Sequence, residues 1–273
     1  MRYKITLSYN GSDFCGWQSQ RGAATVQETL EKALSLLLGA EIAVIGAGRT
    51  DSKVNAVGYV ASFDFPAPSG PVPPTLERSE TDIETRQIRY KLNAILPRSI
   101  VVHSIVPAAP DFHARFDARA REYTYFLHRR KDPFMEGRSL FYSFPLDVSA
   151  MNEAAAGLLG TRDFAAFQKI GGDNKTSVCT VTEAKWIIYK PDHVRLMGYK
   201  AAEGDYMYFR IRADRFLRNM VRAAVGTLLE IGRGKREPRW IEEVLASGSR
   251  SSAGESVPGY PLFLSKVEYG DSE

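Results

Sequence analysis

Arg49 and Asp51 stand two residues apart in IGAGRTDSKVNA (residues 45–56), a glycine-containing segment that follows an apolar run. An aspartate held by an arginine is ionised at neutral pH, which suits a nucleophile or a base better than a general acid. The segment lacks the third glycine of a dinucleotide-binding loop and the Gly-Lys-Ser/Thr of a phosphate-binding loop. The alternative is an ordinary ion pair in a surface turn, since such pairs are common and contribute little to stability.

Two predicted strands alternate arginine and tyrosine on one face, a pattern that favours RNA binding. Arginine binds phosphate in a bidentate fork, and tyrosine offers a plane on which a base can stack. The alternative is a solvated strand face with amphipathic tyrosines. The two sets are Arg119, Arg121, Tyr123 and Tyr125 in one strand and Tyr206, Tyr208, Arg210 and Arg212 in the other.

A third group of candidates lies in an apolar segment, residues 214–231, for which we predict a long helix. Arg215, Arg218 and Arg222 have the spacing i, i+3, i+7, which would place them on one helix face. Such a stripe costs free energy unless it meets an anion, either phosphate or a buried carboxylate. Asp51 is the carboxylate that we nominate.

The elements that must position these residues form two halves, 1–108 and 109–273, with a boundary at the segment PAAPDF (107–112). In the first half, Thr25 and Glu28 form a predicted capping box for a helix that ends near Gly39. Predicted strands cover 2–9, 41–47, 59–65 and 99–106, and a second helix covers 84–95. Residues 66–85, rich in Pro and Ser and then charged, are predicted to be an inserted surface loop.

The second half repeats this arrangement. Predicted strands cover 119–128, 178–190, 206–213 and 262–269, with helices after Asp147, over 214–231 and from Pro238. Strands outnumber helices without strict alternation, which favours an α+β fold with a mainly antiparallel sheet over a doubly wound parallel sheet.

Composition restricts the function classes further. The net charge of +4 over 273 residues permits an acidic partner such as nucleic acid without demanding one. Cys15 and Cys179 form no disulfide framework, and the four scattered histidines lack the spacing of a metal site. No signal sequence or membrane-length apolar run is present, so we expect a soluble cytoplasmic protein.

Short motifs lie along nearly the whole chain: YNG (9–11), FCGWQSQ (14–20), TVQ (25–27), AGRTD (47–51), DFHARF (111–116), REYTY (121–125), FLRNMVR (216–222) and LFL (262–264). In this order, these motifs resemble those of the tRNA pseudouridine synthases of the A type. The resemblance implies an isomerase that converts uridine to pseudouridine in the tRNA anticodon stem-loop, at tRNA positions 38, 39 and 40. It also implies no cofactor, two similar ferredoxin-like halves around a central antiparallel sheet with helices on one face, and a homodimer with a basic cleft.

The resemblance assigns roles to the candidate residues. Asp51 would be the nucleophile, Arg49 would help to flip the base, and Tyr123 would stack on the uracil and serve in proton transfer. Arg222 would pair with Asp51, and Leu264 would pack beside the base. Arg121, Arg215 and Arg218 are the further candidates for substrate binding.

Three positions depart from the family pattern. Lys53 replaces a glycine, Asn55 replaces a histidine, and Ala223 stands where asparagine is usual. Two alternatives therefore stay open at this point. One is a non-catalytic RNA-binding protein on the same scaffold. The other is a nucleoside or glycoside hydrolase, which would need a second essential carboxylate.

Overall fold

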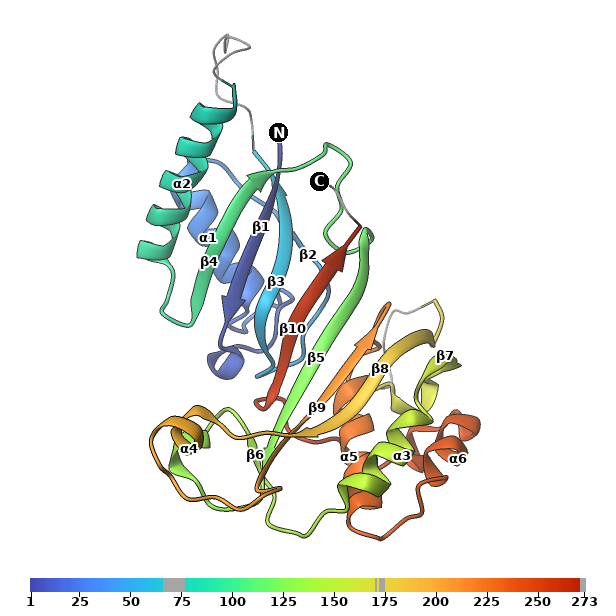
Figure 1. Cartoon of the computed structure of the whole chain (residues 1–273). Coiled ribbons are helices and arrows are strands. Elements are labelled where there is room, and N and C mark those ends of the chain that lie inside the picture. The colour runs from blue at the N-terminus through green and yellow to red at the C-terminus, as the bar shows by residue number, and fades with distance from the viewer. Residues whose placement is uncertain (66–76, 170, 172–174, 271–273) are drawn as a thin grey trace. The chain divides into compact units, whose positions relative to one another are not determined.

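The computed structural model describes residues 1–65, 77–169, 171 and 175–270, with only the backbone described at 77–84. The chain forms two compact units (Figure 1). Unit 1 comprises Met1–Arg119 and Ser265–Glu273, and unit 2 comprises Ala120–Leu264. The sequence places the division at 108/109, whereas the units divide inside two strands. A strand that begins in one unit and ends in the other has no linker composition to mark the change.

Unit 1 is an antiparallel sheet with two helices. Its strands lie in the order β4-β1-β3-β10, and β2 pairs with β3. The bounds are β1 (Arg2–Tyr9), β2 (Val44–Gly46), β3 (Asn55–Asp64), β4 (Ile100–Pro107) and β10 (Leu262–Tyr269), with helices α1 (Val26–Leu38) and α2 (Glu77–Ile95). β1 buries alternate side chains, Tyr3, Ile5, Leu7 and Tyr9. The helices α1 and α2 pack against each other near these strands (Figure 1).

The predicted capping box of α1 is confirmed in its first half. The Thr25 side chain accepts a hydrogen bond from the Glu28 N–H (3.4 Å), and Thr25 itself is extended. Gly39 ends the helix in the left-handed conformation (φ 68°), where the absence of Cβ removes the steric penalty. Val26, Leu30, Ala33 and Leu34 form the buried face of the helix.

The predicted loop at 66–85 is wrong over its second part. α2 begins at Glu77, seven residues before the predicted start at Glu84. The segment that precedes Thr85 contains no Pro or Gly after Pro74, and its charged residues are good or neutral helix formers. Residues 66–76 lie outside the described part of the chain.

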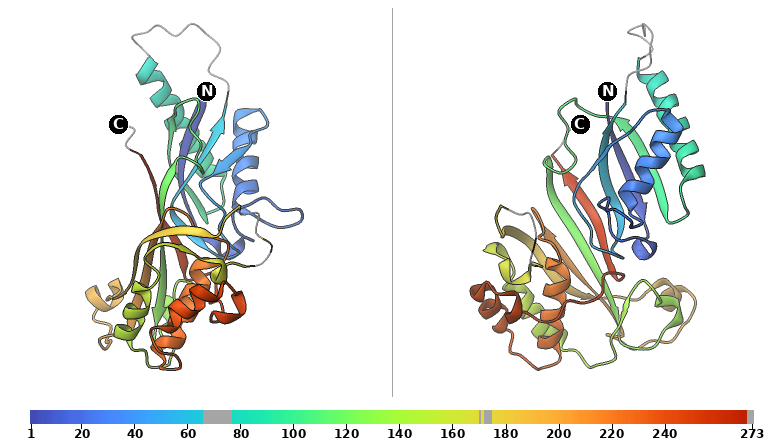
Figure 2. Two further views of the ribbon diagram at one scale, coloured as in Figure 1. Left: turned by 90° about the vertical axis from the view of Figure 1, so that its right-hand side faces the viewer. Right: turned by 180° about the vertical axis from the view of Figure 1, so that it is seen from behind.

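Unit 2 also contains an antiparallel sheet, with strands in the order β5-β9-β8-β7, and β6 pairs with β5 in parallel. The strands are β5 (Ala118–His128), β6 (Leu140–Phe141), β7 (Gly160–Asp163), β8 (Val178–Ile188) and β9 (Tyr206–Ala213). The helices are α3 (Val148–Ala156), α4 (Asp192–Leu196), α5 (Met220–Gly232) and α6 (Trp240–Ser247). α3, α5 and α6 pack together (Figure 2). The prediction of an α+β fold with a mainly antiparallel sheet is confirmed.

Among the described residues, no helix is both long enough and apolar enough to cross a membrane.

Candidate functional site

Asp51 lies in the loop between β2 and β3. The Ala47 N–H donates to Val60 O on β3 (2.9 Å), which attaches the start of the loop to the sheet, and the Val54 N–H donates to Asp51 O (3.2 Å), which closes a turn just before β3. Thr50 is buried, and its hydroxyl forms a 2.9 Å hydrogen bond with the hydroxyl of Tyr9. Asp51 is half-buried between this buried threonine and the exposed Ser52.

A second loop, residues 11–17, packs along the Asp51 loop and binds its backbone. The Trp17 N–H donates to Thr50 O (3.3 Å), and the Lys53 N–H donates to Phe14 O (3.2 Å). Gly16 has a φ of +94°, and a Cβ there would collide with the carbonyl of Thr50. Because the peptide groups on both sides of Asp51 are hydrogen-bonded to this loop, the carboxylate is carried by a pre-organised backbone.

Three aromatic side chains, those of Tyr9, Trp17 and Tyr59, pack together beside the two loops. The rings of Trp17 and Tyr59 stack with centroids 4.0 Å apart, and Tyr9 packs on both rings. The Tyr59 hydroxyl donates a hydrogen bond to Gly48 O. A side chain at Gly46 would collide with Trp17 and Tyr59, which explains the glycine at the end of β2.

The structure shows the setting of the two departures from the family pattern beside Asp51. Lys53 has a φ of 64°, in the left-handed region that glycine adopts freely, so this non-glycine residue is strained there. Asn55 is buried, and its Oδ1 accepts a hydrogen bond from the Gly11 N–H (2.9 Å). The amide of Asn55 therefore joins the start of β3 to the loop that follows β1.

Arg49 is exposed, and its Nε donates to the Gln18 side chain (3.2 Å). Gln18 directly follows the loop (residues 11–17) that binds the backbone of Thr50 and Lys53. The Asp51 loop and its neighbour thus share backbone and side-chain contacts, and all of them lie within unit 1.

The remaining candidate residues lie in unit 2. Tyr123, on β5, is half-buried, and its ring meets Phe216 edge-on with centroids 5.0 Å apart. Leu264, on β10, is buried. Tyr125 is fully buried and donates to Pro258 O (3.2 Å), and burial raises the pKa of its hydroxyl.

The predicted helix over 214–231 is wrong at its start, because α5 begins only at Met220. Asn219, the residue before it, has a left-handed conformation (φ 68°), which interrupts a right-handed helix and which asparagine tolerates better than most residues. Arg215 and Arg218 therefore precede the helix, and the predicted three-arginine stripe does not form.

Each of these arginines has its own environment. Arg222, on α5, is half-buried and donates from Nε to Val257 O (2.7 Å). Arg121 donates to Asp214 O (2.8 Å). Arg218 is exposed, and its carbonyl accepts from the Lys169 N–H (3.0 Å).

The two arginine–tyrosine strand faces do not form one surface. In the antiparallel register, Tyr123 lies opposite Ile211, and Thr124 lies opposite Arg210. Directly opposed residues share a face of the sheet. The face of Arg121, Tyr123 and Tyr125 is thus the face of Phe209 and Ile211, whereas Tyr208, Arg210 and Arg212 point to the other side.

Two residues of the second set are already engaged within unit 2. Arg210 forms an ion pair with Glu183 (2.8 Å), and Tyr206 is buried rather than exposed. The register therefore places the arginines and tyrosines predicted to bind RNA from β9 on the opposite face of the sheet from those predicted on β5.

The comparison with known proteins decides the family. A family model described as tRNA pseudouridine synthase matches residues 154–270. The chain is 43% identical to tRNA pseudouridine synthase A of Parabacteroides distasonis, covering 98% of this chain and 96% of the relative. The protein of the same name from Porphyromonas gingivalis is 42% identical (98% and 97% covered), and that from Bacillus licheniformis is 37% identical (98% and 99% covered).

The chain belongs to the tRNA pseudouridine synthase A family. Its members are isomerases that modify tRNA, so tRNA is the implied substrate of this synthase. The sequence-based resemblance to this family is confirmed.

The synthase also contains a buried polar cluster that the sequence does not predict. The carboxylate of Asp132 accepts hydrogen bonds from His193 Nε2 (2.7 Å), the Tyr206 hydroxyl (2.5 Å) and the Phe134 N–H (2.9 Å). Burial acts to raise the pKa of Asp132, but these hydrogen bonds outweigh it, and the pKa is lowered. His193 and Tyr206 lie 61 and 74 residues along the chain from Asp132, so no local pattern signals the cluster.

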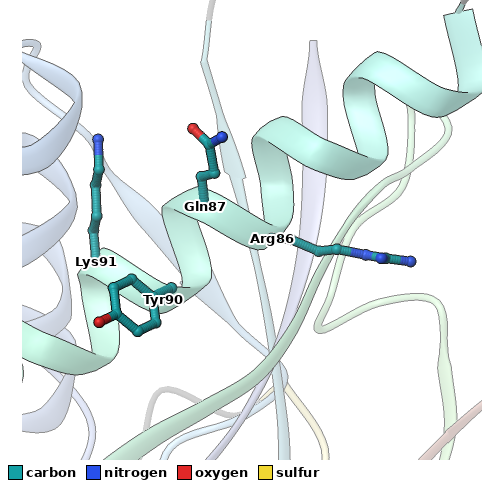
Figure 3. A pocket seen from close by; sticks show the side chains of 4 residues that line it. All are labelled: Arg86, Gln87, Tyr90 and Lys91. Atoms are coloured by element: carbon teal, nitrogen blue, oxygen red, sulfur yellow. The ribbon is translucent and has the colours of Figure 1, made fainter.

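Two further observations concern ligands of the synthase. A shallow surface hollow on α2 is lined by Arg86, Gln87, Tyr90 and Lys91 (Figure 3). It contains none of the candidate residues. In the described part of the chain, no group of three or more His, Cys, Asp or Glu side chains is arranged to hold a metal ion.

Proposed function

We propose that this synthase isomerises uridine to pseudouridine at positions 38, 39 and 40 in the anticodon stem-loop of tRNA, with Asp51 as the nucleophile. The observation that carries the proposal is the fixed backbone of Asp51. Hydrogen bonds at Thr50 O, just before Asp51, and at the Lys53 N–H, two residues after it, hold the chain on either side, and Asp51 is half-buried.

The reaction needs one carboxylate and no change of oxidation state. The target uridine leaves the base stack, because its reacting atoms are inaccessible within the stem-loop. A carboxylate oxygen of Asp51 bonds to ribose C1′ while the N1–C1′ bond breaks and its electron pair stays with the uracil. The uracil rotates, its C5 bonds to C1′, and the ester to Asp51 breaks. C5 loses its proton and N1 gains one.

Other residues of the chain would assist each stage. Arg49 is exposed at the rim of the Asp51 loop, which suits a contact with the RNA backbone during base flipping. Tyr123 offers its half-buried ring to the uracil and its hydroxyl to the proton transfer, and Leu264 supplies apolar packing. The pairing of Arg222 with Asp51 stays a prediction, as does phosphate binding by Arg121, Arg215 and Arg218.

The proposal is tested by tritium release from tRNA that carries uridine labelled at C5. The wild-type protein is expected to release tritium, because C5 loses its hydrogen on isomerisation. Asp51→Asn should abolish release while the tRNA dissociation constant stays within several-fold, since phosphate contacts dominate affinity.

Three outcomes would contradict the proposal. Release by Asp51→Asn at the wild-type rate would exclude this carboxylate as the nucleophile. Intact tRNA binding with no release by the wild type would favour a non-catalytic RNA-binding protein. Free uracil as the product would favour a hydrolase. Mapping of the product then shows which of the three tRNA positions is modified.

We further propose a cytoplasmic homodimer, on the basis of the family resemblance. Sedimentation equilibrium at micromolar concentration tests the dimer, for which a mass of twice the 30.4 kDa chain is expected.

A further inference from the structure

Phe116 lies in the connection between β4 and β5 and exposes 74% of its surface. It belongs to the segment DFHARF (111–116), whose other phenylalanine, Phe112, packs on Tyr269 with ring centroids 5.3 Å apart. An exposed phenylalanine is common on a flexible loop. This loop, however, is held by a dense set of hydrogen bonds.

Several of these hydrogen bonds join residues of the loop to one another or to Asp117, which follows it. The side chain of Asp117 accepts a hydrogen bond from the His113 N–H (2.8 Å). His113 Nδ1 in turn accepts from the Arg115 N–H (3.2 Å) and the Phe116 N–H (3.3 Å). The backbone of Phe116 also donates to His113 O (3.1 Å), so the position of Phe116 is determined by its neighbours.

Two strands of unit 1 attach the loop to the sheet. Arg2, on β1, donates to Phe112 O (2.9 Å), and the Tyr269 hydroxyl, on β10, donates to Ala114 O (2.6 Å). Ala114, in the middle of the loop, is fully buried. The chain therefore presents the Phe116 ring to solvent from a fixed base.

An arginine and an imidazole ring lie beside the Phe116 ring. The Arg115 guanidinium lies 5.6 Å from the ring centroid, and the His113 ring lies 4.3 Å from it. Of the acids in and around the loop, Asp64 is paired with Arg2, the charge of Asp111 also acts on Arg2, and Asp117 accepts the His113 N–H.

We infer that the DFHARF loop is an RNA contact in which Phe116 stacks on an unpaired base of the tRNA and Arg115 binds an adjacent phosphate. A rigidly held, exposed aromatic ring beside an arginine matches the usual recognition of unpaired bases in RNA. The Arg115 guanidinium beside the ring complements a phosphate that flanks such a base. The inference rests on the proposed function only in taking tRNA as the ligand.

The decisive experiment measures the tRNA dissociation constant of Phe116→Ala and Phe116→Trp over a series of salt concentrations. Phe116→Ala should weaken binding by about fivefold or more, because a base–aromatic stack is worth about 1–3 kcal/mol. Its salt dependence should match that of the wild type, since no charge is lost. Phe116→Trp should keep the wild-type affinity. Arg115→Gln should instead reduce the slope of log K against log salt by about one.

Tyr90→Ala is the matched control. Tyr90 is 77% exposed in the same unit and lies beside Arg86 and Lys91 on α2 (Figure 3). Equal weakening by Tyr90→Ala and Phe116→Ala would show a general surface effect and overturn the inference. Thermal unfolding of each variant confirms that the fold is retained, as expected for side chains this exposed.

Two results would overturn the inference in other ways. Wild-type affinity of Phe116→Ala would exclude the stack. A change of oligomeric mass in Phe116→Ala, with unchanged affinity per binding site, would assign the ring to contact with a second copy of the chain. The tritium assay on the wild type separates this test from the proposed function. Absence of release with a weakened Phe116→Ala would refute the proposed reaction and leave the RNA contact standing.

Discussion

Replacement of Asn55 by alanine tests whether the hydrogen bond between Asn55 and Gly11 stabilises the protein and positions the Asp51 loop. Asn55 exposes 3% of its surface and accepts the Gly11 N–H through Oδ1 at 2.9 Å. Gly11 is itself buried, and a side chain there would collide with the carbonyl of Val54, so the two segments meet at backbone contact distance. Alanine would leave the Gly11 N–H buried without its acceptor.

The magnitude follows from the cost of an unsatisfied buried donor, about 1–3 kcal/mol. With a urea dependence of about 2 kcal/mol per molar, a loss of about 2 kcal/mol lowers the unfolding midpoint by about 1 M. Asn55→His is the informative partner variant, because one ring nitrogen of a neutral histidine can accept the same N–H. We expect it to recover at least half of the lost stability.

The same variant should also lose activity, for a reason that is separate from its lower stability. The Gly11 contact fixes the segment that binds Thr50 and Lys53, and small misplacement of a nucleophile costs one or two orders of magnitude in rate. Asn55→Ala is therefore expected to lower kcat by at least about tenfold in the tritium assay while tRNA affinity is retained. Ser12→Ala, which changes an exposed side chain next to Gly11, is the control for both measurements. A stability change below about 0.5 kcal/mol in Asn55→Ala, with normal kcat, would refute the reasoning.

Three other substitutions have expected outcomes. Lys53→Gly removes the left-handed strain at φ 64°, which costs about 1 kcal/mol, but it increases the entropy of the unfolded chain. The urea midpoint should therefore stay equal or rise slightly, and a clear fall would contradict the strain. Asp132→Asn should lose about 1.5–3 kcal/mol at neutral pH, because the carboxylate accepts three hydrogen bonds. Since the pKa of Asp132 is lowered from 3.8, its contribution is present above that pH and lost below it, so the acid limb of a stability–pH curve should flatten in the variant. Tyr125→Phe should cost about 1 kcal/mol through the bond to Pro258 O. Burial raises the pKa of Tyr125 above 10, so the stability that its neutral hydroxyl contributes is present below pH 10 and declines above it. In urea titrations at increasing pH, Tyr125→Phe should therefore lose stability less steeply at alkaline pH than the wild type.

Local features of this chain follow from the sequence alone. Thr25 and Gly39 bound α1 because a side-chain cap and a left-handed glycine act within a few residues. The alternation along β1 shows which of its side chains are buried, since period two is a property of a single strand. The motif around Asp51 and its resemblance to the family are likewise visible in the sequence alone, because both depend on residue order.

The tertiary structure alone decides what depends on pairing between distant segments. The register of β5 against β9 separates two arginine–tyrosine faces that look equivalent in sequence, because a shift of one residue reverses every side chain of a strand. Asn219 adopts a left-handed conformation where helical periodicity continues through it. Asn55 gains its role only because Gly11, 44 residues earlier, is brought within hydrogen-bond distance of its side chain. Local sequence preferences determine which segments become helices or strands. Contacts between distant segments determine which face of a strand is buried, where an element ends and which buried polar groups form hydrogen bonds.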